Sequence, residues 1–175
     1  GYRTSLVESR DLAAGTSSKS SKLIHGGLRY LESLEIGLVR ESLRERELLL
    51  RLAPELVRRQ TFFLPVYAET TRRPLTLRLG LSLYALLAGL RPSVRFRKVP
   101  TREWDGLDGL RTEGLQNVFA YTDAQTDDRE LTRAVMRSAV ELGAHLLCPA
   151  EFVSATIESD HCTVTVRRQG LDTVI

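Results

Sequence analysis

The chain has 175 residues, of which 42% are hydrophobic and 27% are charged, and its formal net charge is +3. This composition is typical of a folded soluble protein and excludes a disordered or fibrous chain. The length is sufficient for one sizeable hydrophobic core. The small positive charge suits an anionic substrate or a membrane surface. Arginines and aromatic residues do not alternate in a pattern that indicates nucleic-acid binding, so no nucleic-acid partner is expected.

The first strand signal lies at residues 4–8 (TSLVE), which predict a short buried strand ending in a carboxylate. Gly1 is placed like the glycine that closes a helix, although no helix precedes it. In a dinucleotide-binding unit a strand, a glycine-rich turn and a helix come first, and the acid that ends the second strand binds the adenosine ribose. Glu8 stands at that position, although a strand-terminal glutamate is more often simply solvated. We therefore expect a fragment that begins inside a Rossmann-type unit and lacks the N-terminal glycine-rich strand, turn and helix, with no signal peptide.

Residues 15–30, GTSSKSSKLIHGGLRY, combine small hydroxyl side chains, glycines and basic residues. Hydroxyls offer hydrogen bonds on short side chains, and glycines let the backbone approach a ligand closely. Lys22 supplies a compact positive charge, and Arg29 supplies a planar fork suited to phosphate or carboxylate. The segment is therefore expected to lie against a polar, anionic and partly planar ligand. The alternative is a solvated loop, rich in serine and threonine, before a helix.

The order of these residues resembles the FAD-dependent glycerol-3-phosphate dehydrogenases, which belong to the D-amino-acid-oxidase-like superfamily. In that family a GTSS-x-S-[ST]-KLIHGG-x-RYL segment lines the flavin, and this chain matches it almost letter for letter. The resemblance continues through residues 38–57 and 121–144 and is weakest between residues 69 and 117. It implies FAD as the cofactor.

The resemblance also implies roles for individual side chains. It places the following residues against FAD, with Glu8 at the ribose and Phe152 at the adenine: Glu8, Thr16, Ser17, Ser21, Lys22, Leu23, Ile24, His25, Gly26, Gly27 and Phe152. It makes Arg29 and Tyr30 the catalytic pair that faces the substrate. An arginine can hold an anionic oxygen, and a tyrosine can donate a hydrogen bond. Taken alone, the pair would be interpreted as a surface arginine beside a half-buried tyrosine at a helix start.

The middle of the chain predicts scaffold elements. Apolar residues recur at helical spacing between residues 36 and 53, and Pro54 ends this helix. Residues 61–67 predict a buried strand. Residues 75–90 are the most apolar part of the chain and are too short to span a membrane. They predict either a core helix in a substrate-cap region or an amphipathic helix in a bilayer interface. Basic residues lie in and around this segment: Arg72, Arg73, Arg78, Arg91, Arg95, Arg97 and Lys98.

In the last third of the chain, residues 118–121 predict a strand and residues 144–148 predict a parallel strand. Between them a helix is expected to begin at an Asp127 cap, with Glu130 three residues on, and to end at Gly143. Asp123, Asp127 and Asp128 are explained by turns and capping rather than by a metal site. Residues 152–157 and 162–168 predict two strands joined at residues 159–160.

Cysteine and histidine spacing gives no indication of a metal or redox centre. Cys148 and Cys162 are far apart, and neither belongs to a CxxC pair. We expect two buried free thiols, as in a protein of a reducing compartment. The histidines at positions 25, 145 and 161 also lack the spacing of metal ligands, so no metal ion is expected.

The predicted fold class is α/β, with part of a Rossmann-like FAD-binding domain and an inserted substrate-cap segment. Residues 1–60 are assigned to the FAD-binding domain and residues 61–120 to the inserted cap. Residues 121–175 are assigned to the return into the FAD-binding domain, with the start of a β-meander.

The function implied by the resemblance is oxidation of sn-glycerol 3-phosphate to dihydroxyacetone phosphate, with FAD taking the hydride and quinone taking the electrons. The implied location is cytoplasmic, with peripheral contact on the inner face of the cell membrane. One alternative is a glycerol-3-phosphate oxidase that uses oxygen. Another is a truncated, non-catalytic remnant or a basic interaction module. Without a glycine-rich turn the pyrophosphate lacks a helix N-terminus, so the isolated 175 residues are expected to bind FAD poorly and to turn over nothing.

Overall fold

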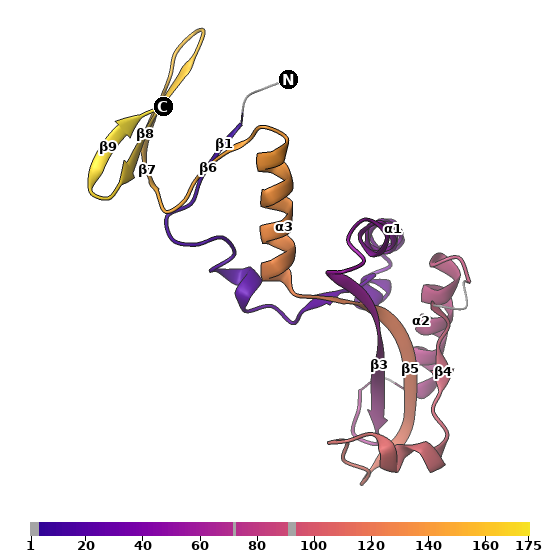
Figure 1. Ribbon diagram of the computed structural model, residues 1–175. Coiled ribbons are helices and arrows are strands. Elements are labelled where there is room, and N and C mark those ends of the chain that lie inside the picture. Colours follow the sequence, from indigo (N-terminus) through magenta and orange to yellow (C-terminus); the bar gives the residue numbers. More distant parts are fainter. Residues whose placement is uncertain (1–3, 72, 91–93) are drawn as a thin grey trace. The chain divides into compact units, whose positions relative to one another are not determined.

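The computed structural model describes residues 4–71, 73–90 and 94–175. The chain divides into two units: unit 1 comprises Gly1–Ser21 with Asp127–Ile175, and unit 2 comprises Lys22–Thr126. Figure 1 shows the elements of each unit. The predicted features at Gly1, Arg72 and Arg91 lie outside the described residues.

Unit 1 contains a short parallel pair of strands and one long helix. β1 (Ser5–Val7) pairs in parallel with β6 (His145–Leu147). The helix α3 (Asp128–Glu141) leads into β6 and begins at an Asp127 cap, whose carboxylate accepts from the backbone N–H of Arg129 at 3.0 Å and of Glu130 at 3.3 Å. Gly143 follows the last turn with φ of 98°. Both predicted ends of this helix and the parallel strand after it are confirmed.

The strand β1 is more exposed than the sequence predicts. Leu6 at its centre is 41% exposed, so the expectation of a buried strand is wrong. Among the described residues β1 pairs only with β6, which leaves much of its surface uncovered.

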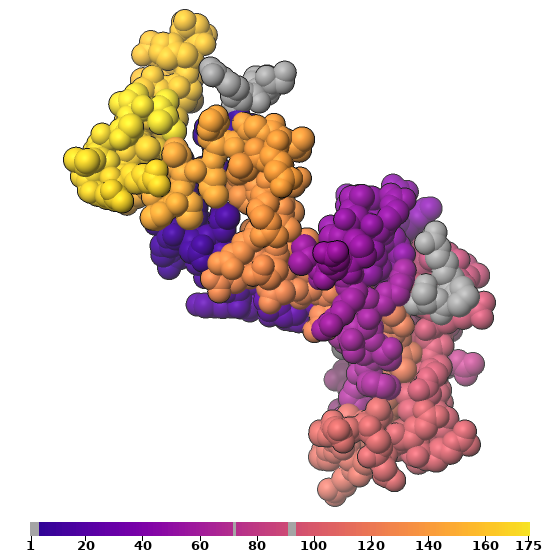
Figure 2. All heavy atoms as spheres, in the orientation of Figure 1, coloured from indigo at the N-terminus to yellow at the C-terminus, as the bar shows by residue number. Residues whose placement is uncertain are grey.

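The end of unit 1 is an antiparallel meander of β7 (Glu151–Ile157), β8 (Cys162–Arg168) and β9 (Leu171–Val174). Its atoms run from gold to yellow in Figure 2, and every residue of β7 is exposed. The predicted hairpin around residues 159–160 is confirmed. Both cysteines are free, but Cys162 is exposed and Cys148 is partly exposed. The prediction of two buried thiols is therefore wrong, because Cys162 is the first residue of β8 and is exposed.

Unit 2 is built on an antiparallel sheet with β5 (Leu115–Thr126) at its centre (Figure 1). β3 (Val57–Tyr67) pairs with one edge of β5 from Val57 opposite Thr126 to Tyr67 opposite Leu115. β2 (Leu23–Ile24) and β4 (Arg97–Lys98) pair with the other edge of β5. Pro65, which has no backbone N–H, is accommodated because β3 is an edge strand in the described sheet. Both long strands extend beyond the predicted residues 61–67 and 118–121.

Two helices and a 3₁₀ turn pack in unit 2. The helix α1 (Ile36–Leu52) contributes Val39 and Leu43 to a core that also contains Leu31 from the turn η2 (Leu28–Leu31). The helix α2 (Pro74–Leu87) contributes Tyr84 to this core and Leu81 to a second cluster with β3 and β5. Residues 36–53 and 75–90 thus form helices as predicted, and one face of α2 is buried. A second 3₁₀ helix, η4 (Thr101–Gly106), packs its tryptophan against Val99, which follows β4, and against β5.

These elements confirm the α/β class. The assignment of residues 1–60, 61–120 and 121–175 to domains stays a prediction, and the two units divide the chain at other positions. No helix within the described ranges is long and apolar enough to cross a bilayer. Nor do residues 4–71, 73–90 and 94–175 bring together three His, Cys, Asp or Glu side chains that could hold a metal ion.

Candidate functional site

The predicted cofactor-binding residues fall in both units. In unit 1 the serine-rich loop forms the 3₁₀ turn η1 (Thr16–Ser18) beside the start of α3. Ser18 Oγ donates to the carbonyl oxygens of Ala14 at 3.0 Å and Gly15 at 2.7 Å. Ser20 Oγ donates to the Asp128 carboxylate at the first turn of α3. These two hydroxyls hold the loop in place.

Two other hydroxyls of the loop, those of Thr16 and Ser21, are accessible to a ligand. Thr16 and Ser21 are exposed, and no side-chain hydrogen bond of either occurs among the described residues. Ser17 is half-buried, and its Oγ lies 3.5 Å from Thr132 Oγ1 on α3. The hydroxyls of Ser18 and Ser20 therefore stabilise the loop conformation. The exposed hydroxyls of Thr16 and Ser21 can bind a polar ligand.

An ion-pair clamp ties the preceding residues to α3. Asp11 Oδ2 accepts from Arg129 Nη2 and from Arg133 Nη2, each at 2.9 Å. Hydrogen bonding from Arg129, with further help from Arg133, outweighs desolvation and lowers the pKa of the Asp11 carboxyl. The clamp fixes the position of the chain between β1 and the loop, although Asp11 is exposed and both arginines are partly exposed, so its energy is small.

Of the two remaining candidates of unit 1, Glu8 follows a strand and Phe152 lies on one. Glu8 follows β1 directly, and its Oε1 accepts from the Arg10 backbone N–H at 2.8 Å. That bond leaves the second carboxylate oxygen free to accept from a ligand hydroxyl. Phe152 lies near the start of β7, is 57% exposed, and pairs with Val166 beside a register shift.

In unit 2 the segment His25, Gly26 and Gly27 connects β2 to η2. Gly27 adopts φ of 76°, which favours glycine, and its N–H donates to His25 Nδ1 at 3.2 Å. In neutral His25 the ring proton therefore lies on Nε2. A Cβ added to Gly26 would lie 2.2 Å from the Tyr84 hydroxyl and 2.4 Å from Leu43 Cδ2. Close packing thus requires glycine at position 26, and a left-handed backbone favours it at position 27.

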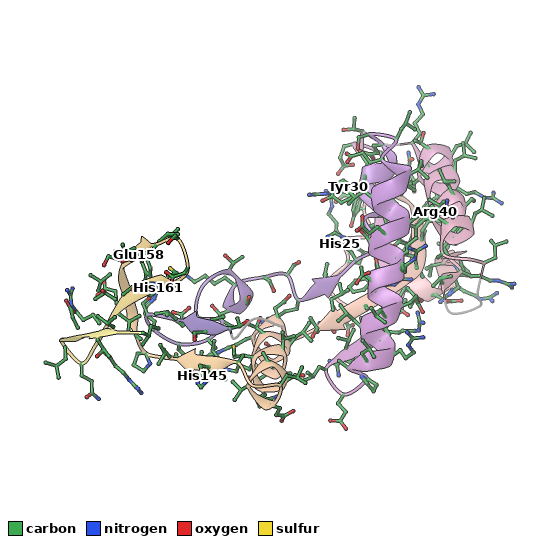
Figure 3. All side chains as sticks on the ribbon, turned by 90° about the horizontal axis from the view of Figure 1, so that it is seen from above. His25, Tyr30, Arg40, His145, Glu158 and His161 are labelled. Atoms are coloured by element: carbon green, nitrogen blue, oxygen red, sulfur yellow. The ribbon has the colours of Figure 1, made fainter. Side chains whose placement is uncertain are left out.

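The catalytic pair predicted from the sequence lies in η2, just after these glycines. His25 and Tyr30 both lie beside α1 (Figure 3). The Arg29 guanidinium lies 5.1 Å from the centre of the Tyr30 ring, and Arg29 Nη2 donates to the Tyr30 hydroxyl at 3.3 Å. The Tyr30 ring in turn lies against Gly27, where an added Cβ would be 2.7 Å from Tyr30 Cδ2. Arg29 is exposed and Tyr30 half-buried, so both side chains can reach a ligand.

A buried polar cluster of Arg46, Tyr84 and Asp123 lies against Gly26. Asp123 on β5 accepts from Arg46 Nη1 of α1 at 2.5 Å and from the Tyr84 hydroxyl of α2 at 3.1 Å. Asp123 Oδ1 also accepts from the Gly26 backbone N–H at 3.2 Å. Burial, followed by the negative charge of Asp123, raises the pKa of Tyr84, so its hydroxyl stays protonated as a donor. The sequence interpretation gave Asp123 a turn or capping role, which is wrong, because Asp123 is a 3% exposed strand residue with an ionic partner.

The cluster continues to the surface through Glu47. Arg46 Nη2 donates to Glu47 Oε1 at 3.1 Å, and Arg59 Nη2 of β3 donates to Glu47 Oε2 at 2.7 Å. Partial burial raises the pKa of Glu47, but the hydrogen bonds and charges of Arg59 and Arg46 outweigh it, and the net shift is downward. The chain of charges therefore links β5, α1 and β3.

Comparison with known proteins gives the family. The family model described as "FAD dependent oxidoreductase" matches residues 1–175, the whole chain. The chain belongs to this family. The match confirms FAD as the cofactor expected from the sequence.

Two of the similar proteins are glycerol-3-phosphate dehydrogenases. That of Mycobacterium leprae is 44% identical over 163 residues, which cover 91% of this chain and 28% of the relative. The crystal structure of the enzyme from Bacillus halodurans, complexed with FAD, superimposes with a TM-score of 0.62 at 23% identity, over 100% of this chain and 28% of that chain. The structure of the L-alpha-glycerophosphate oxidase of Mycoplasma pneumoniae, with FAD bound, superimposes with a TM-score of 0.62 at 15% identity. The superposition covers 93% of this chain and 42% of the oxidase chain. The chain thus spans little more than a quarter of the length of the dehydrogenases.

The open side chains of each unit fit parts of FAD chemically. In unit 1, the exposed hydroxyls of Thr16 and Ser21 suit phosphate oxygens, and a carboxylate oxygen of Glu8 suits a ribose hydroxyl. In unit 2, the Nε2–H of His25 offers a donor. The assignment of particular residues to FAD stays a prediction, as does the catalytic role of Arg29 and Tyr30.

Three residues of the buried cluster were absent from the sequence-derived site: Arg46, Tyr84 and Asp123. One signal could have drawn attention to them, because charged residues on the apolar faces of a helix or strand are rarely buried without partners. Arg46 follows the buried Leu43 by three positions on α1, and Asp123 follows Tyr121, which packs against two apolar clusters, by two positions on β5. Nothing in the sequence shows that the two face each other.

The close packing around Gly26 predicts that a larger residue at this position reduces FAD binding. Replacing Gly26 by alanine should displace residues 25–30 and sharply reduce FAD bound per chain, because the new methyl group clashes with Tyr84 and Leu43. The measurement is the ratio of flavin absorbance at 450 nm to protein absorbance in the purified intact protein. Gly37→Ala is the matched control, since a Cβ at Gly37 in α1 meets nothing within 4 Å. Equal FAD content in both variants would contradict the prediction.

The lowered pKa of Glu47 generates the second prediction. A carboxyl with a lowered folded-state pKa stabilises the protein above its ordinary value of 4.5, and this contribution disappears as the pH falls through the folded-state pKa. Glu47→Gln should therefore reduce the free energy of unfolding at pH 7 by about 1 kcal/mol or less. The difference from wild type should shrink below pH 4.5.

Urea unfolding at several pH values measures this difference. Glu45→Gln is the control, since Glu45 is exposed on the same helix and forms no ion pair with a described residue. A difference between wild type and Glu47→Gln that is constant from pH 7 to pH 3 would show that the ion pairs do not carry the effect.

Proposed function

We propose that the chain is part of an enzyme that oxidises sn-glycerol 3-phosphate to dihydroxyacetone phosphate with FAD. The observation that carries the proposal is the Arg29–Tyr30 pair, which presents a guanidinium and a phenol hydroxyl together beside Gly26 and Gly27. A phosphorylated alcohol needs both groups, one for the anion and one for a neutral oxygen. The name of the Mycobacterium leprae relative supports the same substrate.

The two side chains divide the work of holding the substrate. Arg29 holds an anionic substrate oxygen, and stacking over the Tyr30 ring limits the directions in which its planar fork points. The Tyr30 oxygen accepts from Arg29 Nη2, so its own proton is available for a substrate oxygen. When bound, FAD would supply the acceptor for the hydride from C2 of the substrate, while the C2 hydroxyl would give its proton to a base. The protein's contribution is the fixed orientation of the alcohol carbon.

We also propose that the electrons pass to quinone and that the protein works in the cytoplasm, in peripheral contact with the inner face of the cell membrane. The support is the exposed face of α2, where Leu75, Leu79 and Leu86 are 66%, 63% and 58% exposed. Their spacing places them on one side of the helix. The exposed Arg78 lies on the same helix and can approach anionic headgroups.

The substrate proposal predicts the effect of removing Arg29. Arg29→Ala should lower kcat/KM for glycerol 3-phosphate by about 10- to 150-fold, since a hydrogen bond to a charged group contributes about 1.5–3 kcal/mol. FAD content should stay the same. The assay is glycerol-3-phosphate-dependent reduction of an electron-accepting dye by the intact protein, corrected for FAD content.

Arg44→Ala is the matched control, because Arg44 is exposed on α1 and makes no ion pair with a described residue. An Arg29→Ala variant within twofold of wild type would overturn the role of the pair. FAD-loaded wild type that reduces no dye with this substrate would overturn the proposed function. Steady hydrogen peroxide production, in place of quinone reduction, would identify the oxygen-using oxidase.

The membrane proposal predicts the effect of removing two exposed leucines. The double variant Leu75→Ser/Leu79→Ser should bind vesicles containing anionic phospholipid at least about tenfold more weakly, since less apolar area enters the bilayer interface. Sedimentation with the vesicles measures the bound fraction. The control is Val135→Ser/Leu142→Ser, which removes two apolar side chains that are 62% and 87% exposed elsewhere. Equal loss in both double variants would refute a specific role for α2.

A further inference from the structure

The buried cluster in unit 2 joins three elements at one carboxylate. Asp123 comes from β5, Arg46 from α1 and Tyr84 from α2, and their exposed fractions are 3%, 1% and 1%. The Tyr84 hydroxyl lies 3.1 Å from both carboxylate oxygens, and Arg46 Nη1 lies 2.5 Å from Oδ1. The same Oδ1 accepts from the Gly26 N–H at 3.2 Å. The cluster therefore binds the backbone amide of Gly26, in the segment that leads to Arg29.

Stability alone does not explain this arrangement. A buried ion pair rarely stabilises a protein more than well-packed apolar side chains of the same volume, because both charges lose their hydration. Arg46 also buries its Nε, which has no hydrogen-bond partner among the described residues. An unpaired buried donor is unfavourable. What the charges provide, and apolar side chains cannot, is a directional anchor for the Gly26 amide.

The anchored amide lies three positions before the Arg29–Tyr30 pair. After Gly26 the chain turns through Gly27, whose carbonyl oxygen accepts from the Tyr30 backbone N–H at 2.9 Å. This bond begins η2 and sets the direction in which the Tyr30 ring and the Arg29 side chain leave the backbone. A displacement of the Gly26 peptide would therefore also displace the side chains of Arg29 and Tyr30.

We propose that Arg46, Asp123 and Tyr84 are positioning residues that anchor the Gly26 amide and thereby fix Arg29 and Tyr30 in the arrangement that holds the anionic substrate. The inference rests on the proposed function for the role of that pair. The three residues act through the Gly26 backbone, and no contact of their own with substrate is required.

Hydrogen exchange in the intact, FAD-loaded protein tests the anchoring without reference to activity. Tyr84→Phe removes one of the donors to Asp123 but keeps the Arg46–Asp123 ion pair, so it is the variant expected to remain folded. The amides of residues 23–31 should exchange several-fold faster than in wild type. Tyr121→Phe is the matched control, since Tyr121 lies edge-on to Tyr84 and its hydroxyl makes no hydrogen bond among the described residues. Unchanged exchange in folded Tyr84→Phe would overturn the anchoring.

A double-mutant cycle with Arg29→Ala tests the functional consequence. Tyr84→Phe should raise KM for glycerol 3-phosphate by about three- to tenfold with kcat changed less, because the interaction lost is one that holds the substrate. In the Arg29→Ala background the same change should have little further effect on KM, since the side chain it positions is gone. A merely structural role would give independent effects that multiply, and that result would overturn the proposal.

Asp123→Asn provides an independent check, since the amide removes the charge but keeps the shape. It should also accelerate exchange in residues 23–31 and raise KM, and a wild-type KM and exchange rate in folded Asp123→Asn would count against the proposal. If wild type holds FAD but does not oxidise glycerol 3-phosphate, the proposed function fails. The exchange experiment then still decides whether the cluster anchors the segment.

Discussion

The contact on which unit 2 depends is the buried ion pair between Arg46 and Asp123. Two charges less than 4% exposed can remain in a protein interior only if each has its counter-charge and further hydrogen bonds. That requirement fixes α1 against β5, and the Tyr84 hydroxyl draws α2 to the same carboxylate. The glycine at position 26 follows from it, because the backbone passes too close to Leu43 and Tyr84 for any side chain there.

In unit 1 the serine-rich loop is held in place by weaker contacts that are exposed to solvent. The serine-rich loop is held by hydroxyls that bond to its own carbonyls and to Asp128 at the start of α3. The Asp11 clamp onto Arg129 and Arg133 adds charge pairs at the surface, where water screens them. The loop leaves Thr16 and Ser21 open, which is what a loop that binds phosphate oxygens needs. In unit 2 the rigid cluster instead fixes an arginine and a tyrosine through the backbone.

Much of the fold could be predicted from local rules. The ends of α3 follow from an Asp cap and a terminating glycine, and the structure has both. The helices at residues 36–53 and 75–90 follow from apolar periodicity. The long strands were predicted too short because their ends, VRRQ in β3 and DAQT in β5, are polar and carry no apolar pattern. Arg59 and Asp123 are tolerated there because Glu47 and Arg46 pair with them, which a window of neighbouring residues cannot show.

The sequence by itself determined the family, the cofactor and the segment that carries the candidate catalytic pair, since the order GTSSKSSKLIHGGLRY is too specific to arise in an ordinary loop. It also determined where the helices form, because capping and periodicity act over a few residues. Only the tertiary structure decided that Asp123 is an anchor and not a turn residue. Its partners, Arg46 and Gly26, lie 77 and 97 positions away in the chain. Burial raises the strength of such a contact by excluding water, and burial is a property of the packed chain rather than of any one segment.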